Sequence, residues 1–141
     1  MTYWLVSSGT TEDPHIDDDW QARESRWVDQ YGDVWQFKRR GRPRIVPGDR
    51  LVTYAVGSQR TFGKGRVFSL LEVTSEPEPG EHERWSWIVG VRYLASVPLL
   101  SLSPTLDDIG VSPMSVRRQS HIRLSPEQGR RAEELITARN G

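Results

Sequence analysis

A turn runs directly into a strand in the stretch Val46-Pro47-Gly48-Asp49-Arg50-Leu51-Val52-Thr53-Tyr54. Proline presets the φ angle of the first central turn residue, and glycine accepts the positive φ that the second often needs. From Arg50 to Val56 the side chains alternate well enough to favour a β-strand. The middle of the chain is therefore predicted to belong to a sheet.

Four further segments carry strand signals, and one segment near the C-terminus carries a helix signal. The strand segments are Tyr3 to Val6, Arg66 to Thr74, Trp85 to Val97 and Gln119 to Leu124. The longest of them places large apolar side chains at every second position, which predicts a half-buried strand. The helix is predicted from Ser125-Pro126-Glu127-Gln128, a capping box with proline at the first helical position.

The connections between these segments are polar or rich in proline and glycine. Glu76 to Glu81 reads as an exposed connection, 99–108 as a connection with one helical turn, and 10–34 as polar with short helical turns. Five strands and a terminal helix predict an α+β fold, a small curved β-barrel of about five to six strands flanked by helices.

Composition limits the class of protein. The 141 residues, 35% hydrophobic and 27% charged, predict one globular domain over 1–141. No apolar run approaches the roughly 18 residues of a membrane span, and Met1 to Trp4 lack the pattern of a secretory signal. The absence of cysteine excludes disulfides, thiol catalysis and thiolate zinc sites. We therefore expect a cytoplasmic protein without a membrane partner.

Signals for catalysis and for metal or cofactor binding are absent. His15, His82 and His121 lie in separate segments without metal-ligand spacing, and each is interpreted as a surface or hydrogen-bonding residue. The adjacent acids 17–19 cannot all point at one ion. Neither a Gly-x-Ser-x-Gly nucleophile motif nor a phosphate-binding loop ending in Lys-Ser/Thr is present. The sequence predicts no catalytic residue, metal or cofactor, and hence no enzyme.

The formal net charge is zero, but the charges are segregated. Residues 1–37 hold eight acids and two bases, a net −6, whereas 38–50 hold six bases and one acid, a net +5. The basic part belongs to Trp35-Gln36-Phe37-Lys38-Arg39-Arg40-Gly41-Arg42-Pro43-Arg44. Aromatic rings stack on bases and Arg or Lys binds phosphates, so this stretch favours nucleic-acid binding. The alternative is that Trp35 and Phe37 are core residues beside a solvated loop.

Two other groups of residues can likewise be interpreted either as part of a ligand-binding site or as purely structural. Arg117-Arg118-Gln119-Ser120-His121 could hydrogen-bond a base edge or a phosphate, or could be loop charges beside a sheet edge. Trp85 and Trp87 share one strand face and could line a pocket or fill the core.

The order of these segments resembles an EVE domain, a member of the PUA-like group related to YTH readers. The resemblance runs from Tyr3-Trp4-Leu5-Val6-Ser7-Ser8 through Trp35 and the Pro47-Gly48-Asp49 turn to Gly63–Val73 and Val116–Gln128. It covers essentially the whole chain. It implies a small β-barrel with a pocket that holds a flipped, modified base, methylation being the expected modification, in DNA or RNA. The family's usual Trp-x-Gly-Val-Arg stretch is replaced here by Trp35-Gln36-Phe37 and the basic loop.

The resemblance and the residue patterns together give a set of candidate site residues. The candidates for the base pocket are Ser7, Ser8, Trp35, Phe37, Tyr54, Trp85, Trp87, Arg118 and Ser120. The candidates for phosphate binding are Lys38, Arg39, Arg40, Arg42, Arg44 and Lys64.

Two alternatives stay open at this point. The related ASCH fold can hydrolyse modified nucleosides, which would require Lys38 or Lys64 to converge with a carboxylate in the pocket. The other alternative is a structural or adaptor domain whose aromatic residues all lie in the core.

Overall fold

The structure is a computed structural model that describes residues 1–7, 34–55, 65–80, 86–97, 102–112 and 121–140, without the side chains of Lys38 and Ala55. Its strands are β1 (Tyr3–Ser7), β2 (Val34–Lys38), β3 (Arg50–Ala55), β4 (Arg66–Val73), β5 (Glu78–Pro79), β6 (Ser86–Ser96) and β7 (His121–Arg123). The short 3-10 helix η3 (Asp107–Ile109) and the helix α2 (Pro126–Ala138) complete the described elements.

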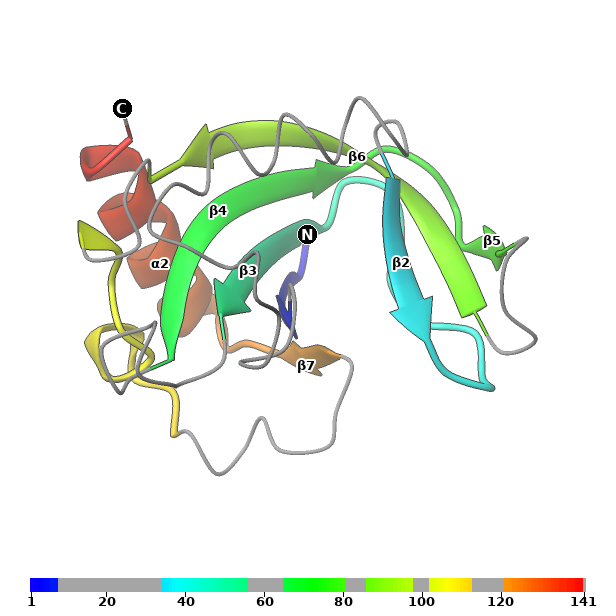
Figure 1. The fold of residues 1–141 in the computed structure, drawn as a ribbon, viewed down its shortest axis with the longest axis horizontal. Helices are drawn as coiled ribbons and strands as arrows, with labels where there is room; N and C mark the ends of the chain where they lie inside the picture. Colours follow the sequence, from blue (N-terminus) through cyan, green and yellow to red (C-terminus); the bar gives the residue numbers. More distant parts are fainter. Residues whose placement is uncertain (8–33, 56–64, 81–85, 98–101, 113–120, 141) are drawn as a thin grey trace, which may run out of the picture.

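The strands form one strongly curved sheet in the order β2-β6-β4-β3-β1-β7, and β5 pairs with β6 (Figure 1). β1 runs parallel to β3, while β7 runs antiparallel to β1. Figure 1 shows α2 packed at one end of the curved sheet and β2 at the other. The predicted α+β class and small curved barrel are confirmed.

Apolar side chains lie on both faces of the sheet, and each face has its own core. One face carries Leu5, Val52 and Leu70 and is covered by Ala132 and Ile136 of α2. The other face, here called the inner face, is packed with Val6, Phe37, Ile45, Leu51, Leu71, Val73, Val89 and Val91. Irregular pairing at Thr53/Tyr54 leaves Phe68 as an extra residue in β4. Such a bulge bends a strand and increases its twist, which suits a closing barrel.

The sheet curls toward its inner face. β2 and β7 lie at the two ends of the strand order, yet the rings of Phe37 and His121 have centroids 5.3 Å apart. His121 pairs with Val6 across the β1–β7 ladder, and directly opposed residues share a face. Contact between side chains therefore brings the two end strands together.

The helix α2 is fixed to the sheet at one close contact. The capping box is complete, with Ser125 accepting from the Gln128 amide at 3.1 Å and donating its own amide to Gln128 Oε1 at 2.9 Å. A Cβ atom added at Gly129 would collide with the ring of Tyr3. The Tyr3 hydroxyl donates to Glu133, which also pairs with Arg50. The predicted capping box and helix start are confirmed.

All five predicted strands are present, and two further strands, β2 and the short β5, were not predicted. Each of the five lies within its predicted segment or extends it by one residue: β1, β3, β4, β6 and β7. Some predicted positions lie outside the described residues, namely Val56, Trp85, Gln119, Ser120 and the helical turns expected before Val34. The prediction treated 35–44 as a basic loop after aromatic residues, whereas Val34–Lys38 is a strand paired with β6. The exposed connection contains the two-residue strand β5, and η3 lies within the connection predicted to hold a helical turn.

Among the described residues, no helix has both the length and the apolar character needed to span a bilayer.

Candidate functional site

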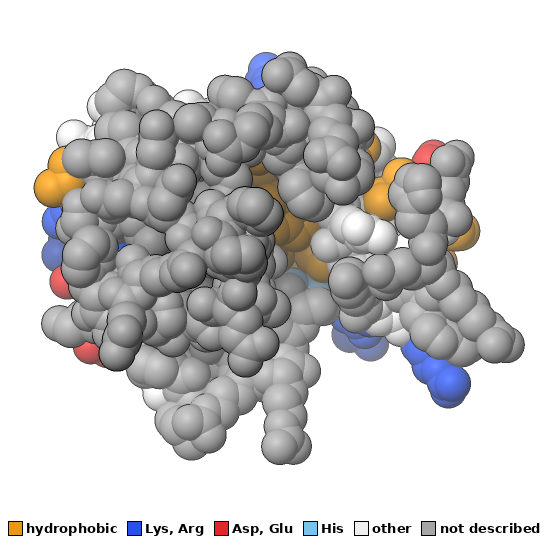
Figure 2. Space-filling model, viewed as in Figure 1, with side chains coloured by type: hydrophobic (Ala, Val, Ile, Leu, Met, Phe, Trp, Pro, Cys, Tyr) orange, Lys and Arg blue, Asp and Glu red, His pale blue; other side chains and the backbone are white. Residues whose placement is uncertain are grey.

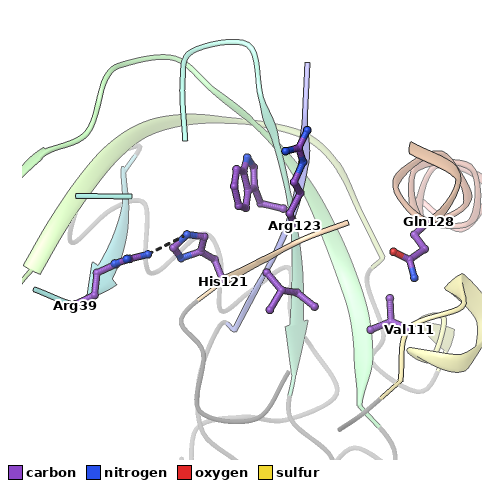
Figure 3. Close-up of a pocket in the computed structure, with 7 residues that line it drawn as sticks. Arg39, Val111, His121, Arg123 and Gln128 are labelled. Atoms are coloured by element: carbon purple, nitrogen blue, oxygen red, sulfur yellow. Dashed lines mark hydrogen bonds between the residues drawn. The ribbon is translucent and has the colours of Figure 1, made fainter. Parts of the chain in front are cut away.

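A groove of about 580 Å³ lies along β7 at the edge of the sheet. We call it the β7 groove. The described residues that line it are Trp4, Arg39, Val111, His121, Ile122, Arg123 and Gln128 (Figure 3). In Figure 2 a histidine side chain is visible beside apolar side chains near the middle of the face, with Lys or Arg side chains below.

The strand register places the lining residues on both sides of β7. Trp4 is directly opposite Arg123, and both lie on the inner face with His121. Ile122 points to the other face and packs against the core beneath α2. Figure 3 shows Arg39 directed at His121 from one side, with Gln128 and Val111 on the α2 side. The groove thus follows an edge strand rather than the centre of the barrel.

Trp4 is held in place by the carboxylate of Asp49. The indole Nε1 donates to Asp49 Oδ2 at 2.9 Å, while the amides of Thr2 and Val46 donate to the same carboxylate at 2.9 and 3.2 Å. Asp49 is buried, and Gly48 before it has a φ of 93°, as the predicted turn requires. The turn that begins β3 therefore also fixes one aromatic wall of the groove.

His121 connects the two ends of the sheet within the groove. Its ring meets Trp4 edge to face, with centroids 5.2 Å apart, and meets Phe37 in the same manner. Arg39 Nη1 lies 3.2 Å from His121 Nε2. A guanidinium group only donates, so Nε2 accepts this bond and the imidazole is neutral. Burial, and then the positive charge of Arg39, lower the pKa of His121 from 6.5 to about 4.

The charge of the groove is positive among the residues described. Arg39 and Arg123 contribute guanidinium groups, His121 is neutral at pH 7, and no Asp or Glu is present among the described lining residues. Gln128 is already used by the capping box and by its bond to the Gly110 carbonyl at 2.8 Å. An anionic ligand with a flat ring matches this combination of cations and aromatic edges.

The structure separates the predicted base-pocket residues. Trp35 and Trp87 are partly buried on the inner face, and Phe37 is 1% exposed and belongs to the core of that face. Tyr54 is buried on the opposite face, so it cannot share a pocket with Trp35 or Trp87. The prediction that Phe37 and Tyr54 face an open pocket is therefore wrong, because each ring is surrounded by other core side chains. Ser8, Trp85, Arg118 and Ser120 lie outside the described residues.

Ser7 is used within the fold. It is paired with Tyr54 across the β1–β3 ladder, and its side chain hydrogen-bonds the Tyr54 side chain. Burial raises the pKa of Tyr54, and the bond from Ser7 partly offsets that rise. This pair belongs to the face that α2 covers.

The predicted phosphate-binding residues also diverge. Of the described ones, only Arg39 lines the β7 groove. The Arg40 carbonyl accepts a bond from Trp87 Nε1 at 3.2 Å, Arg42 forms an exposed ion pair with Glu76 at 3.0 Å, and Arg44 is exposed. The Lys38 side chain and Lys64 lie outside the described residues.

Sequence reasoning missed Trp4 and Arg123 as members of a site. Both occupy short strands whose partners lie far away in the sequence, so no local pattern brings them together. The only usable signal in the sequence was the alternation of Trp4 with Leu5 and of Arg123 with Ile122. It indicates that the side chains of Trp4 and Arg123 point away from the face that α2 covers.

No group of three or more potential metal ligands occurs in the described parts of the chain.

No family model matches the chain, and no curated protein matches it in sequence. Solved structures are similar in fold. A hypothetical protein from Leishmania major is 16% identical with a TM-score of 0.59, over 95% of this chain and 96% of that one. A protein from Rhodopseudomonas palustris is 17% identical with a TM-score of 0.56, over 100% and 97%. One from Agrobacterium tumefaciens is 16% identical with a TM-score of 0.55, over 98% and 95%. Identities this low establish the shared fold alone.

Proposed function

We propose that this chain is a non-catalytic nucleic-acid-binding module of the EVE type, and that it holds a modified base of DNA or RNA in the β7 groove. One observation carries the proposal. Two guanidinium groups, Arg39 and Arg123, share a groove with the aromatic rings of Trp4 and His121, and no carboxylate accompanies them among the described lining residues.

The chemistry of these groups suits a nucleotide. A base stacked on an aromatic ring gains about 1–3 kcal/mol, and guanidinium groups form two-pronged bonds to phosphate oxygens. A base can stack on a protein ring only when it is unpaired, so the ligand is a single-stranded or extruded nucleotide.

Recognition of a methyl group needs more than apolar contact. Burial of one methyl group contributes about 0.8 kcal/mol, roughly fourfold in affinity. Stronger discrimination requires that the unmodified base leave a polar group unpaired in the groove.

Fluorescence titration of the tryptophans tests the proposal at low salt, with methylated and unmethylated oligonucleotides. The test variant is Arg123→Ala, which removes an exposed groove cation, and the matched control is Arg44→Ala, which removes an exposed cation outside the groove lining. We expect quenching by the wild type, about tenfold weaker binding by Arg123→Ala, and binding within twofold of wild type for Arg44→Ala.

Two results contradict the proposal. The first is that no oligonucleotide quenches the wild type at low salt. The second is equal weakening by both variants, which would assign the binding to general positive charge rather than to the β7 groove. Incubation with acylated cytidines, followed by assay of acyl release, tests the hydrolase alternative, and turnover would replace the binding module by an enzyme.

A further inference from the structure

The hydrogen bond between Arg39 and His121 constrains both partners. Arg39 cannot give up its proton, and it can only donate. It therefore requires the lone pair of His121 Nε2, which leaves the histidine proton on Nδ1. A second proton on the ring would remove the acceptor and place two positive groups 3.2 Å apart.

An oxyanion in the groove changes this balance. A phosphate oxygen is a stronger acceptor for a guanidinium group than a neutral imidazole is, because both partners of the new bond are charged. When Arg39 turns to the phosphate, Nε2 loses its donor and becomes available for a proton. The negative charge of the phosphate also favours the imidazolium form.

We propose that the Arg39–His121 pair is a proton-coupled phosphate site. A phosphate oxygen of the bound strand takes the Nη1 donor of Arg39, and the bond from Nη1 to Nε2 breaks. His121 takes one proton from solvent at Nε2 and donates that N–H to the same phosphate group. This inference rests on the proposed function, since the phosphate is that of the bound nucleic acid.

The surroundings of His121 support a change of charge on binding. The charged groups near its ring, among the described residues, are Arg39 beyond the end of β2 and Arg123 on β7, while Asp49 lies behind Trp4 and is bonded to it. β1 presents Trp4 and Val6 to the ring, and β2 presents Phe37, none of which titrates. Among the described residues, the charges that face the ring are therefore positive, and an anion in the groove would balance them.

The coupling has a definite size and sign. In the protein without bound phosphate, burial and the charge of Arg39 hold the pKa of His121 at about 4. If the phosphate restores the ordinary value of about 6.5, binding becomes tighter as the pH falls, roughly eightfold between pH 7 and pH 5.5. At pH 6 the complex then takes up about three quarters of a proton.

Two measurements test the proposal with different probes. In the first, NMR follows the histidine Cε1–H signals from neutral pH to below the free-state value, with and without sulfate, at ionic strength matched with chloride. Sulfate carries the oxygens of a phosphate group without titrating in this range, and a His121→Gln spectrum assigns the signal. We expect sulfate to raise the pKa of His121 by one unit or more.

In the second, calorimetry at pH 6 in two buffers of different ionisation enthalpy measures proton uptake when an oligothymidylate binds. Thymine does not titrate there, so uptake reports the protein. Arg39→Met should raise the pKa of His121 measured without sulfate and abolish the sulfate response. Arg42→Ala, which alters an exposed ion pair on the same segment, should change neither.

The outcomes separate this inference from the proposed function. Oligonucleotide binding without proton uptake, together with a His121 signal indifferent to sulfate, overturns the proton-coupled site and leaves nucleic-acid binding in place. A sulfate response of His121 without binding of any oligonucleotide supports the anion site and contradicts the nucleic-acid proposal.

Discussion

The indole Nε1 of Trp4 donates a 2.9 Å hydrogen bond to Oδ2 of Asp49, and this bond joins the first strand to the turn before β3. Asp49 is only 3% exposed, and it also accepts bonds from the amides of Thr2 and Val46. One carboxylate therefore fixes the start of β1, closes the turn and orients an aromatic wall of the β7 groove.

Replacement of Asp49 by alanine should lower the free energy of unfolding by about 3 kcal/mol, because three donors lose an ionised acceptor. Asp49→Asn should lower the free energy of unfolding by about half as much. The amide keeps one acceptor oxygen, but its NH2 group is a donor and faces the remaining donors. Urea denaturation followed by tryptophan fluorescence measures both. Glu78→Ala, an exposed acid on β5, is the control and should stay within about 0.5 kcal/mol of wild type. An Asp49→Ala variant as stable as that control would contradict this account.

Gly129 shows that the contact between α2 and the sheet limits the side chain at that position. In an isolated helix Gly→Ala is favourable by about 1 kcal/mol. Here the added Cβ meets the ring of Tyr3. Overpacking of this kind costs about 1–3 kcal/mol or more, so Gly129→Ala should destabilise the protein despite the better helix propensity.

Thermal and urea unfolding measure the effect, and Arg130→Ala, at the exposed neighbouring position, is the matched control. In a Tyr3→Ala background Gly129→Ala should lower the free energy of unfolding less than it does in the wild type, because the ring that is struck is absent. A stabilising Gly129→Ala would show that the helix and sheet are not in close contact.

Local patterns in the sequence were sufficient for the elements whose signals are local. The capping box at Ser125 and Gln128 forms because both partners lie within one helical turn, and β3 begins directly after a turn fixed by Gly48. β2 escaped prediction because its five residues carry two large aromatic rings at alternate positions and lead into cations, a pattern equally suited to a binding loop. Its pairing with β6 is a long-range contact that no short window contains.

The site was harder to predict because it depends on which face each strand buries. Phe37 and Tyr54 are both aromatic residues in strands, yet they lie in the cores of opposite faces. The bulge that leaves Phe68 extra in β4 exchanges the faces within that strand, so Val67 lies in the core beneath α2 while Leu71 and Val73 lie in the inner-face core, although plain alternation would place all three together. Curling then brings His121 of β7 to Phe37 of β2, a contact between segments distant in the sequence.

His121 should make the stability of the fold depend on pH in the acidic range. Its pKa is about 4 in the folded protein and about 6.5 in the unfolded chain, so the unfolded chain binds more protons between these values. Stability from this residue is therefore complete above about pH 6.5 and is lost as the pH falls toward 4. Because solvent screens a half-buried ring in part, we expect the free energy of unfolding to fall by about 1–2 kcal/mol over this pH range.

Urea unfolding of wild type and His121→Gln at neutral pH and near pH 4.5 isolates the contribution of His121 to the free energy of unfolding, because all other titrating groups are common to both proteins. The difference in stability between them should shift in favour of the variant at acidic pH. A difference that does not change with pH would mean that His121 has an ordinary pKa in the folded protein.

The two groove arginines should each appear in the salt dependence of oligonucleotide binding. Each phosphate contact to a single strand contributes about 0.7 to the slope of log K against log salt concentration, because one contact releases a fixed share of condensed counterions. Arg39→Ala and Arg123→Ala should each reduce the slope by about that amount, and the double variant by about twice as much. Arg42→Ala should leave the slope unchanged, since Glu76 already neutralises that side chain away from the groove. A slope that falls equally for Arg39→Ala and Arg42→Ala but is unchanged for Arg123→Ala would place the strand along the basic segment 38–44 instead, because only a backbone lying there would meet Arg42 as closely as it meets Arg39.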